Sequence, residues 1–550
     1  GIVDPIGATA FCTPKLTTLH DPSLMPNCDR AAERIVGALR RGERIVIYGD
    51  YDVDGLTAAA ILLRILRAIH PEAPVTHYLP DRVKEGYGLH AGAVETLARD
   101  GADLIVTVDS GITARKAARA AKAAGVDLII TDHHTVPPED RLPDALIVHP
   151  RLPGSTYPYG ELCGAGVAFK LAWRIATCWC EAERVDEALK DTLLQLLPLA
   201  ALGTVADVVP LTGENRTLTS FGLRLLTQTN LTGLRVMLEQ TKLEEKKAVE
   251  SEHVAFQIAP RINAAGRLDH ADQALELLTS NDAARCRAIA DELDRLNRQR
   301  QETERSIFRH AMEMAVERAM TGDDHRAIVL TDHSWHPGVI GIVCSRLVER
   351  FGRPTILLAE KNGVCKGSGR TIYGFSLHDG LEAVKDHLDS FGGHAMAAGL
   401  SLATKNVPAF TEAFVEHCNG CITTDGMMPS IVVDLDAALR ELDHRAVTQL
   451  EGLAPFGREN RRPAIRVERA VVDGPPRTMG KDNRHLSVQI RQEHDGQPRV
   501  MRGVWWKQGE VAPKLAAGMP IDLVVEPKLN TWNGRTSVEV EFRDILIHGS

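Results

Sequence analysis

Between residues 44 and 149, short apolar segments alternate with segments of helical spacing. The apolar segments cover residues 44–50, 75–79, 103–109, 127–134 and 145–150. The helical segments cover residues 56–70, 92–101 and 113–125. The last two helical segments end at Gly101 and Gly125, and glycine commonly ends a helix. Strands that alternate with helices of this length predict βαβ units and a mostly parallel sheet.

Acidic and histidine residues follow three of these predicted strands. They are Asp50, Asp52, Asp54, Asp109, Asp132, His133 and His134. In open α/β sheets, ligands bind outside the carboxyl ends of the strands, so we expect these side chains at one edge of the sheet. Asp207 lies within the apolar segment 203–211, where an aspartate is costly to bury unless it is paired or binds a metal.

Two other interpretations of these aspartates are open. A single aspartate at a strand end is more often the N-cap of the next helix than a metal ligand. Several uncompensated carboxylates in apolar surroundings are unfavourable, however, and divalent cations are the simplest compensation. The spacing of Asp50, Asp52 and Asp54 also mimics the start of an EF-hand loop, but the twelfth position is Ile61 and the segment follows a strand.

The type of ligand indicates the type of metal. Carboxylates with one or two imidazoles and no thiolate suit Mn²⁺ or Mg²⁺ better than a structural zinc. One ion that also binds a substrate rarely has five or more protein ligands. Two ions about 3.5–4 Å apart are therefore expected. Asp109 is central in this order and could bridge them. Cys418 and Cys421 form a lone CxxC, which lacks the further ligands of a structural zinc site.

Composition adds only broad limits. The chain has 550 residues, of which 44% are apolar and 25% charged, as expected for a soluble globular protein of about three domains. The net charge of -9 does not indicate a nucleic-acid binder, but metal-binding carboxylates contribute to it and a local groove can still be basic. We expect no membrane span, no signal peptide, reduced cysteines and a cytoplasmic location.

The rest of the chain divides into three further regions. Residues 161–250 are largely helical in pattern, and residues 281–320 form a charged segment near a seven-residue rhythm. A helix of that length would extend about 60 Å and could connect two lobes. A second α/β pattern covers residues 326–420.

After residue 430 the pattern changes to strands. The candidates are residues 464–474, 485–492, 502–506, 521–527 and 535–547. Asn533-Gly534 predicts a hairpin between the last two, and the strands together predict a small barrel or sandwich. Adjacent residues of a strand point to opposite faces, so one of Trp505 and Trp506 is expected to be buried and the other exposed.

These motifs resemble those of a known family. Asp50-Tyr-Asp-Val-Asp-Gly, Val-Asp109-Ser-Gly, Asp132-His133-His134 and Gly203-Thr-Val-Ala-Asp207 are similar to the motifs of the DHH phosphoesterases. Within that family the chain resembles the RecJ exonucleases, through Ala259-Pro-Arg-Ile-Asn-Ala-Ala-Gly-Arg267, Trp335-His336-Pro-Gly-Val, Gly367-Ser-Gly-Arg370 and Phe391-Gly-Gly-His394. The motifs extend over residues 44 to 400 in the expected order.

The resemblance implies roles for individual residues. The metal ligands would be Asp50, Asp52, Asp54, Asp109, His133 and Asp207. The catalytic residues would be Asp109, His133 and His134, with His134 at the edge of the metal site and Asp132 behind the ligands. The DNA contacts would be Arg82, Arg267, His336, Ser368, Arg370 and His394. Arginine suits phosphate oxygens, and the glycines around Ser368 would let backbone approach a phosphate; the alternative is an exposed glycine-rich turn.

The resemblance also implies a fold class and a division of the chain. The fold would be α/β, with a mostly parallel sheet, a long connecting helix, a second α/β domain of DHHA1 type and a C-terminal OB-like β-barrel. The expected boundaries are 1–215 for the DHH domain, 216–325 for the helical region with the connecting helix, 326–425 for the DHHA1-like domain and 426–550 for the OB-like domain.

The activity implied is 5′-to-3′ degradation of single-stranded DNA to 5′-mononucleotides by two-metal-ion hydrolysis, in DNA repair and recombination. The implied partners are single-stranded DNA, a RecQ-type helicase and a single-strand-binding protein, with no membrane and a monomeric state. One alternative is a DHH phosphodiesterase or pyrophosphatase for small substrates, which would not need the C-terminal strands. The other is a non-catalytic scaffold, which would not need to keep every ligand.

Overall fold

The computed structural model describes residues 2–82, 85–182, 184–428, 430–494, 496–532 and 534–548, and only the backbone of His494 and Trp532. Contacts divide the chain into two compact units. The large unit contains His20–Asp207 and Phe221–Ser430, and the small unit contains Gly1–Leu19, Val208–Ser220 and Ile431–Ser550. The division into four domains given above remains a prediction, because each of the two units combines residues from more than one predicted domain.

The first sheet of the large unit is entirely parallel, which confirms the predicted fold class. Its strands are β1 (Ile45–Tyr48), β2 (Val75–Tyr78), β3 (Leu104–Thr107), β4 (Asp127–Thr131) and β5 (Leu146–Val148). The strand order is β2-β1-β3-β4-β5. From β1 the chain first adds β2 on one side and then returns to add β3 on the other side, so the topological switch point lies between β1 and β3. Ligands of such sheets bind at the carboxyl ends of the strands that flank this point.

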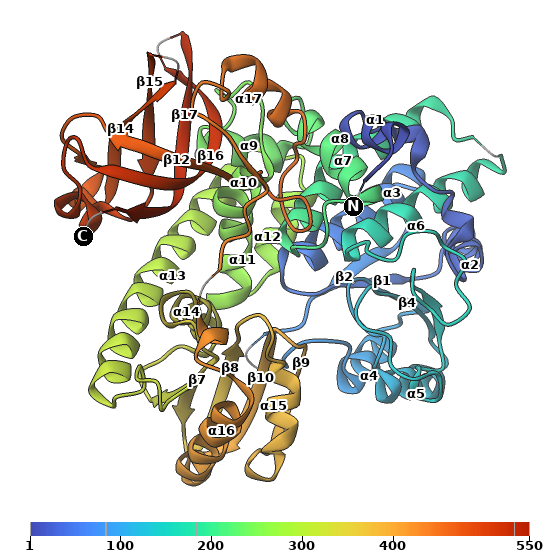
Figure 1. The fold of residues 1–550 in the computed structure, drawn as a ribbon. Coiled ribbons are helices and arrows are strands. Elements are labelled where there is room, and N and C mark those ends of the chain that lie inside the picture. The colour runs from blue at the N-terminus through green and yellow to red at the C-terminus, as the bar shows by residue number, and fades with distance from the viewer. Residues whose placement is uncertain are drawn as a thin grey trace. The chain divides into compact units, whose positions relative to one another are not determined.

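Helices cover both faces of this sheet (Figure 1). One face packs on α4 (Ala91–Arg99) and α5 (Arg115–Ala124), around a core that includes Tyr48, Ile105 and Ile130. The other face carries α2 (Cys28–Arg41), α3 (Val53–Ile69) and α6 (Gly164–Cys180). Because both faces are covered, β1 and β3 are buried along their whole length and β4 is buried except at Asp127, as their uninterrupted apolar segments predict. The edge strand β2 is partly exposed.

Helix α7 (Glu187–Ala206) is a long apolar helix of the large unit. Among the described residues, it alone has the length and composition to cross a membrane, and 67% of its apolar window is buried inside the protein. It packs against α3 and α6, so its apolar residues belong to the core of this unit. Its last residue precedes Asp207.

Shorter helices follow, and a long one continues from them. They are α8 (Gly213–Leu226), α9 (Thr232–Thr241), α10 (Ser251–His253), α11 (Ala259–Leu268) and α12 (Asp272–Thr279). The long helix α13 (Ala283–Glu317) has 35 residues and begins at the N-cap Asp282, whose carboxylate accepts hydrogen bonds from the amides of Ala284 and Arg285. This is the connecting helix that the sequence predicts over 281–320.

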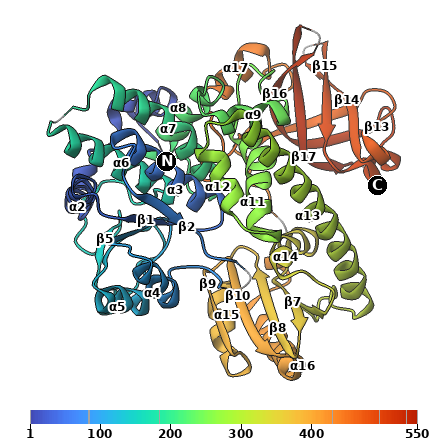
Figure 2. The same cartoon turned by 180° about the vertical axis from the view of Figure 1, so that it is seen from behind.

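The second α/β part of the large unit is a mixed sheet (Figure 2). Its strands are β6 (Ile328–Asp332), β7 (Thr355–Lys361), β8 (Val364–Arg370), β9 (Ser390–Gly393) and β10 (Ala397–Ala403), in the order β6-β7-β8-β10-β9. One face packs on α13 and α14 (Pro337–Phe351), and the other on α15 (Leu377–Ala383) and α16 (Val407–Cys421). Cys418 lies in this core and Cys421 on the surface, so the CxxC pair does not converge on a metal site.

The small unit contains the predicted C-terminal strands. They are β11 (Leu435–Asp436), β12 (Ile465–Val472), β13 (Arg477–Met479), β14 (His485–His494), β15 (Gln497–Trp505), β16 (Pro520–Trp532) and β17 (Arg535–Ile547). They form one sheet in which β12 also pairs with β14, and its core includes Phe542. Strands β16 and β17 pair up to Trp532 and Arg535, as the predicted hairpin requires, although Asn533 lies outside the described residues. Trp505 packs on the core, and Trp506 is 50% exposed.

Arg216 holds three segments of the small unit together, and its replacement by alanine is expected to destabilise that unit. The side chain is buried and donates hydrogen bonds to the carbonyl oxygens of Phe11, Leu453 and Ala454 at 2.7–2.8 Å. Alanine would leave these carbonyls unpaired, at a cost of about 3 kcal/mol in the free energy of unfolding. Denaturant unfolding measures this, with Arg235→Ala on α9 as a control. Equal stability of the two variants would contradict the structural role.

Candidate active site

Loops after β1, β3 and β4 bring the predicted ligands to one end of the first sheet. Asp50, Asp52 and Asp54 follow β1, and Asp109 follows β3 on the other side of the switch point. His133 and His134 follow β4. Asp207 comes from the end of α7, a helix and not a strand, so its arrival at this edge depends on how α7 packs against α3.

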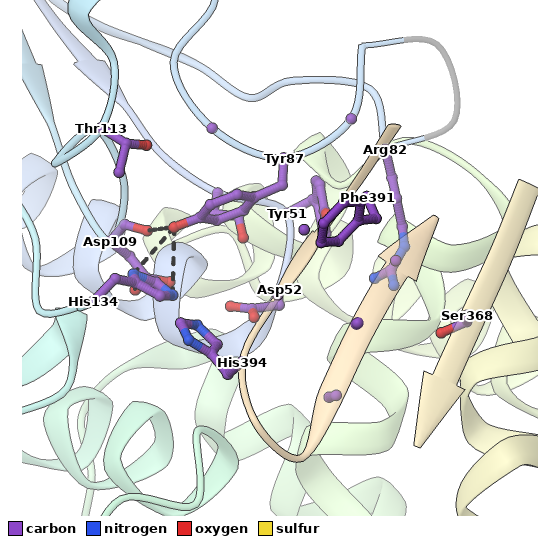
Figure 3. Close-up of a pocket in the computed structure, with 18 of the residues that line it drawn as sticks. Tyr51, Asp52, Arg82, Tyr87, Asp109, Thr113, His134, Ser368, Phe391 and His394 are labelled. Atoms are coloured by element: carbon purple, nitrogen blue, oxygen red, sulfur yellow. Dashed lines mark hydrogen bonds and ion pairs between the residues drawn. The ribbon is translucent and has the colours of Figure 1, made fainter. Parts of the chain in front are cut away.

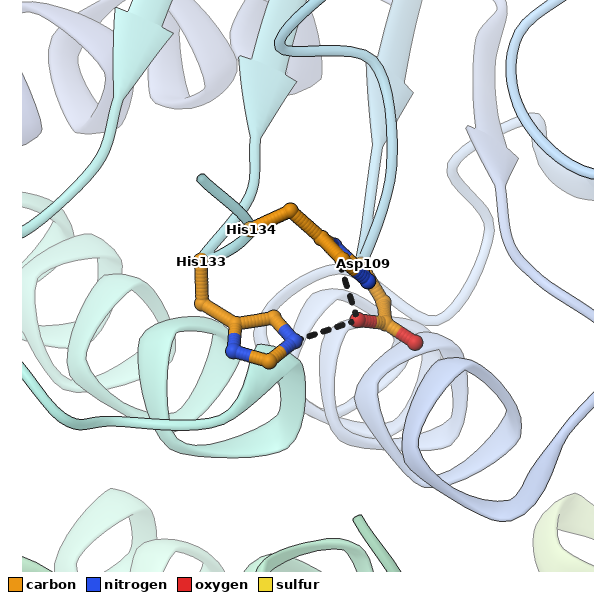
Figure 4. A group of neighbouring side chains, drawn as sticks. All are labelled: Asp109, His133 and His134. Carbon is orange, nitrogen blue, oxygen red and sulfur yellow. Dashed lines mark ion pairs between the residues drawn. The ribbon is translucent and has the colours of Figure 1, made fainter. Parts of the chain in front are cut away.

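The ligand atoms of these residues form three overlapping groups, each within 4.8 Å, and Figure 4 shows the group of Asp109, His133 and His134. The groups are Asp50–Asp52–Asp109, Asp54–His133–Asp207 and Asp109–His133–His134. The structure therefore brings all six proposed ligands together. Asp109 and His133 each belong to two groups, and a cluster with shared donors of this kind would hold neighbouring cations.

The donors of this cluster fit a divalent cation. Oδ1 of Asp50, Oδ1 of Asp109 and Nε2 of His133 are buried and make no hydrogen bond. Nε2 of His133 lies 3.1 Å from Oδ1 of Asp109, but the two atoms form no hydrogen bond. Buried polar atoms of this kind are rare, because leaving them unpaired is costly. Oxygen and imidazole nitrogen atoms that converge in this way are the donors that Mn²⁺ and Mg²⁺ sites use.

The start of α6 holds Asp54 in place. The backbone amides of Gly164 and Ala165 donate to its two carboxylate oxygens at 2.6 and 2.8 Å. On the opposite side, a Cβ added to Gly203 of α7 would lie 2.5 Å from Oδ1 of Asp54. The glycine of the fourth motif is thus the residue that allows α7 to pack directly against this carboxylate.

Asp52 satisfies both interpretations given for the strand-end aspartates. Its carboxylate accepts a hydrogen bond from the amide of Gly55 at 3.1 Å and caps α3. The same side chain contributes an oxygen to the group with Asp50 and Asp109. Capping is therefore compatible with metal binding, because a carboxylate has lone pairs for both.

Asp109 has an unusual backbone, with φ at 57° in the left-handed region. Aspartate tolerates this region better than most residues, and strained residues of this kind concentrate at functional sites. A Cβ added to Gly164 would lie 2.6 Å from Cβ of Asp109, so α6 also packs tightly against this residue.

Burial and mutual repulsion act on the carboxylates of the cluster. Asp50, Asp54 and Asp109 are at most 3% exposed. Burial and the neighbouring negative charge of Asp52 raise the pKa values of all three. Cations bound among them would offset this repulsion, so the electrostatics agree with the geometry.

The two histidines differ in charge. Burial lowers the pKa of His133 to about 4, so its imidazole is neutral near pH 7 and can offer a lone pair. Burial also opposes charge on His134, but its 2.7 Å hydrogen bond to Asp132 and the charge of that carboxylate raise its pKa to about 9. Asp132 also accepts hydrogen bonds from the backbone amides of His133 and Ile112. Asp132 thus holds the backbone amide of His133 and the ring of His134.

A cleft of about 1570 Å³ extends from this cluster to the second sheet of the large unit. Its lining includes five of the six predicted DNA contacts, which are Arg82, Arg267, Ser368, Arg370 and His394. The sixth, His336, does not line it, because Nδ1 of His336 accepts a hydrogen bond from the amide of Gly338 and caps α14. The ring of His394 stacks on that of His134, with centroids 6.2 Å apart.

The arginines of this cleft form a cationic group. Burial and the charges of Arg82, Arg300 and Arg370 lower the pKa of Arg267 to about 9. Nη1 of Arg370 lies 3.4 Å from Oγ of Ser368. Cations held this closely together favour an anionic ligand, and phosphate is the one that arginine pairs with most effectively.

Tyr87 is a site residue that the sequence analysis missed. Its hydroxyl donates to the backbone carbonyl oxygen of Asp109 at 3.2 Å and lies 3.1 Å from Nδ1 of His134 (Figure 3). It stands between Gly86 and Gly88, which have φ values of 86° and 97°. The sequence feature that could have indicated it is a tyrosine between two glycines in a loop that follows a strand. Burial and the charges of Asp132 and Asp109 raise its pKa, so the hydroxyl stays protonated.

Replacement of Tyr87 by phenylalanine is expected to lower the catalytic rate by about 10- to 100-fold, the usual effect of losing a group that orients ligands. The ring would remain, and only the hydroxyl that steadies His134 and the Asp109 loop would be lost. Steady-state cleavage of an oligonucleotide measures the effect. Replacement of the exposed Tyr373 by phenylalanine is the matched control, and an equal response of both variants would remove Tyr87 from the site.

Comparisons with known proteins agree with this arrangement. The model of the DHH family, N-terminal domain, matches residues 44–204, that of the DHHA1 domain residues 324–420, and that of the RecJ OB domain residues 433–544. The single-stranded-DNA-specific exonuclease RecJ of Bacillus subtilis is 39% identical over 98% of this chain, which spans 66% of that protein. The RecJ of Escherichia coli is 34% identical over 93% of this chain and 89% of its own length.

Solved structures of RecJ are also similar to this chain. The crystal structure of RecJ in complex with Mn²⁺ from Thermus thermophilus has a TM-score of 0.80 at 33% identity, over 98% of this chain and 74% of that chain. A crystal structure of exonuclease RecJ bound to manganese has a TM-score of 0.62 at 38% identity, over 74% of this chain and 96% of that chain.

Proposed function

This chain belongs to the family of RecJ single-stranded-DNA-specific exonucleases, and from that premise we propose that it degrades single-stranded DNA from the 5′ end. It would hydrolyse phosphodiester bonds and release 5′-mononucleotides with the aid of Mn²⁺ or Mg²⁺. The observation that carries the proposal is one cleft lined both by the carboxylate and histidine cluster and by the cationic group. Such a cleft can hold a terminal phosphate and a scissile phosphate of one strand.

The proposed metal ligands are the residues of the three overlapping groups. They are Asp50, Asp52, Asp54, Asp109, His133 and Asp207. Cations bound there would supply positive charge for the phosphoryl oxygens and favour the ionisation of a water molecule. The neutral state of His133 and the unpaired oxygens of Asp50 and Asp109 support this assignment.

His134 would act on the scissile phosphate itself. Its raised pKa keeps it protonated near neutral pH, and Nδ1 is engaged by Asp132. Nε2–H would therefore be available to donate to a phosphoryl oxygen, where it adds positive charge as the negative charge grows. Tyr87 and the stacked ring of His394 restrict the tilt of this imidazole.

The polarity of degradation would come from the cationic group. Arg82, Arg267 and Arg370 offer planar donors, and Ser368 offers a hydroxyl, for a terminal 5′-phosphate. An end that is bound there would place the first linkage at the carboxylate and histidine cluster, so that one nucleotide is removed at each cut. A 3′ end lacks the terminal phosphate and would not be held.

The small unit would also bind single-stranded DNA. Trp506 is half-exposed, and Lys507 and Arg535 are exposed near the ends of β15 and β17. Exposed aromatic and basic residues on an OB fold bind single strands by stacking and by charge. Contacts with a RecQ-type helicase and a single-strand-binding protein, the monomeric state and a cytoplasmic location follow from the family resemblance and remain predictions.

A time course with Mn²⁺ and a single-stranded DNA oligonucleotide labelled at its 3′ end tests this function. We expect a descending ladder of labelled fragments, while blunt double-stranded DNA stays intact. Hydrolysis of dinucleotides or pyrophosphate without a ladder would assign the chain to the enzymes for small substrates. Binding without any hydrolysis would indicate a scaffold.

A further inference from the structure

The segment Asp50–Asp54, which includes the first two residues of α3 and is called the Asp50–Asp54 loop, contacts both halves of the cleft, the proposed metal site and the cationic group. Asp50, Asp52 and Asp54 contribute to the proposed metal site. Tyr51, between two of these ligands, carries the guanidinium of Arg82 over its ring at 4.8 Å. A residue of the cationic group therefore rests on the same short loop that supplies three metal ligands.

Helix α11 makes a second connection between the two halves. Oδ1 of Asn263 accepts a hydrogen bond from the backbone amide of Val53 at 3.1 Å, inside the loop. One turn further along the same helix, Arg267 belongs to the cationic group and donates to the carbonyl oxygen of Gly338 at 3.0 Å. Residues four apart lie on the same helix face, so Asn263 and Arg267 both line the cleft.

The packing of α11 leaves little room for independent movement. A Cβ added to Gly266 would lie 2.6 Å from the carbonyl oxygen of Tyr51, and a Cβ added to Gly338 would lie 2.5 Å from that of Arg267. Backbone atoms of the loop, of α11 and of α14 are thus in direct contact. A shift of Arg267 toward an anion would therefore move α11. Because Asn263 of α11 is hydrogen-bonded to Val53, the loop would move with the helix.

We propose that Asn263 is a positioning residue that couples the binding of a 5′-terminal phosphate at the cationic group to the affinity of the metal site. This inference rests on the proposed function and deepens it. An occupied phosphate site would set the loop for metal binding, so that metals bind most tightly when a 5′ end is in place. Linkage requires the converse, that bound metal raises the affinity for the phosphate by the same factor.

Electrostatics determine the sign of the coupling. Without an anion, the positive charges of Arg82 and Arg370 act on Arg267, and the charge of all three also opposes cations bound at the neighbouring carboxylates. A terminal phosphate would neutralise this charge. Geometry and charge therefore both predict positive cooperativity, and coupled sites of this kind commonly change each other's affinity by about tenfold.

The test compares Mn²⁺ affinity in the presence of two short single-stranded oligonucleotides that differ only at the 5′ end. Both carry a phosphorothioate at the first linkage to slow cleavage, and one ends in a 5′-phosphate and the other in a 5′-hydroxyl. Titration of free Mn²⁺ by electron paramagnetic resonance gives the affinity. We expect the phosphate form to tighten Mn²⁺ binding by about tenfold relative to the hydroxyl form.

Asn263→Ala should reduce this ratio to less than about twofold while both oligonucleotides still bind. Asn281→Ala, the same change at an exposed position of the large unit, should keep the ratio. A ratio of one in the natural chain, or an unchanged ratio in Asn263→Ala, would overturn the proposal. If Asn263→Ala does not fold, the natural chain still tests the coupling. Its affinity for each oligonucleotide is measured with Mn²⁺ and with a chelator. The coupling requires that Mn²⁺ raises the affinity for the phosphate form by a larger factor than the affinity for the hydroxyl form.

These outcomes separate the coupling from the proposed function. A chain that makes the descending ladder but shows no dependence of Mn²⁺ affinity on the 5′ group would be an exonuclease without the coupling. A chain that shows the dependence but makes no ladder would retain the coupling and lose the exonuclease assignment.

Discussion

Asp109→Asn is expected to lower the rate of single-stranded DNA cleavage by on the order of 10³- to 10⁴-fold. Asp109 contributes to two of the three ligand groups, so its loss affects both proposed cation positions. Cations at such sites contribute several kcal/mol to the stabilisation of a transition state, and each 1.36 kcal/mol is a factor of about ten in rate. Steady-state cleavage of a labelled oligonucleotide measures the effect.

At position 109, asparagine is a more informative replacement than alanine. It has nearly the same shape as aspartate and tolerates the left-handed backbone of residue 109, whereas alanine adds backbone strain. Alanine at the same position should abolish cleavage as well, with a fold that remains intact. The asparagine variant therefore isolates the loss of one negative charge.

Thermal unfolding with and without Mn²⁺ shows whether the lost activity comes from lost metal. In chelator, Asp109→Asn should be at least as stable as the natural chain, because one of several mutually repelling buried carboxylates is gone. With Mn²⁺ at about 100 times its Kd, the natural chain should gain about 2.7 kcal/mol, and the variant should gain much less. Asp100→Asn, on the exposed end of α4, is the matched control. Full activity or full Mn²⁺ stabilisation of Asp109→Asn would exclude Asp109 as a ligand.

Gly203→Ala should reduce cleavage by about 100-fold although residue 203 has no side chain to contact a substrate. The added methyl group would lie 2.5 Å from Oδ1 of Asp54, 2.5 Å from Cβ of Ala165 and 2.7 Å from Oγ1 of Thr57. Atoms cannot approach so closely, so α7 or the carboxylate must move. A displacement of about 1 Å at a reacting centre commonly costs two orders of magnitude in rate.

The same change should lower the free energy of unfolding by about 1–3 kcal/mol, the usual cost of overpacking a core. Gly92→Ala is the matched control, because Gly92 lies in α4 with no atom within 4 Å of an added Cβ. Alanine is the better helix former there and should stabilise the protein slightly. Cleavage by folded Gly203→Ala at the natural rate would show that α7 does not control the position of Asp54.

Local pattern accounts for the elements of both units. The strands β1, β3 and β4 are short apolar segments because the sheet is buried on both faces, and that burial is visible in the sequence as uninterrupted Val, Ile and Leu. The long helix α13 follows from its charged heptad-like pattern, although its end at Glu317 comes before the expected residue 320. The ligands could be predicted because they directly follow strands whose carboxyl ends must meet at one edge.

Contacts between distant segments could not be predicted in this way. The hydrogen bond from Val53 to Asn263 joins residues 210 positions apart, and no periodicity links them. Tyr87 reaches His134 from a loop in which Gly86 and Gly88 have positive φ values, which favour glycine. His336 matched a family motif but caps α14, a use that depends on where that helix begins.

The sequence by itself determined which residue types this protein places at the ends of its strands, because strand formation and burial depend on local apolar patterns that can be read along the chain. It thereby determined the α/β class, the sheet edge that carries the site and the identity of the proposed ligands. Only the tertiary structure decided which oxygen and nitrogen atoms stay unpaired, which arginines share one cleft with them and which residues hold the loops in place. These depend on distances of a few ångströms between segments far apart in the chain, and such distances arise from packing and not from local pattern.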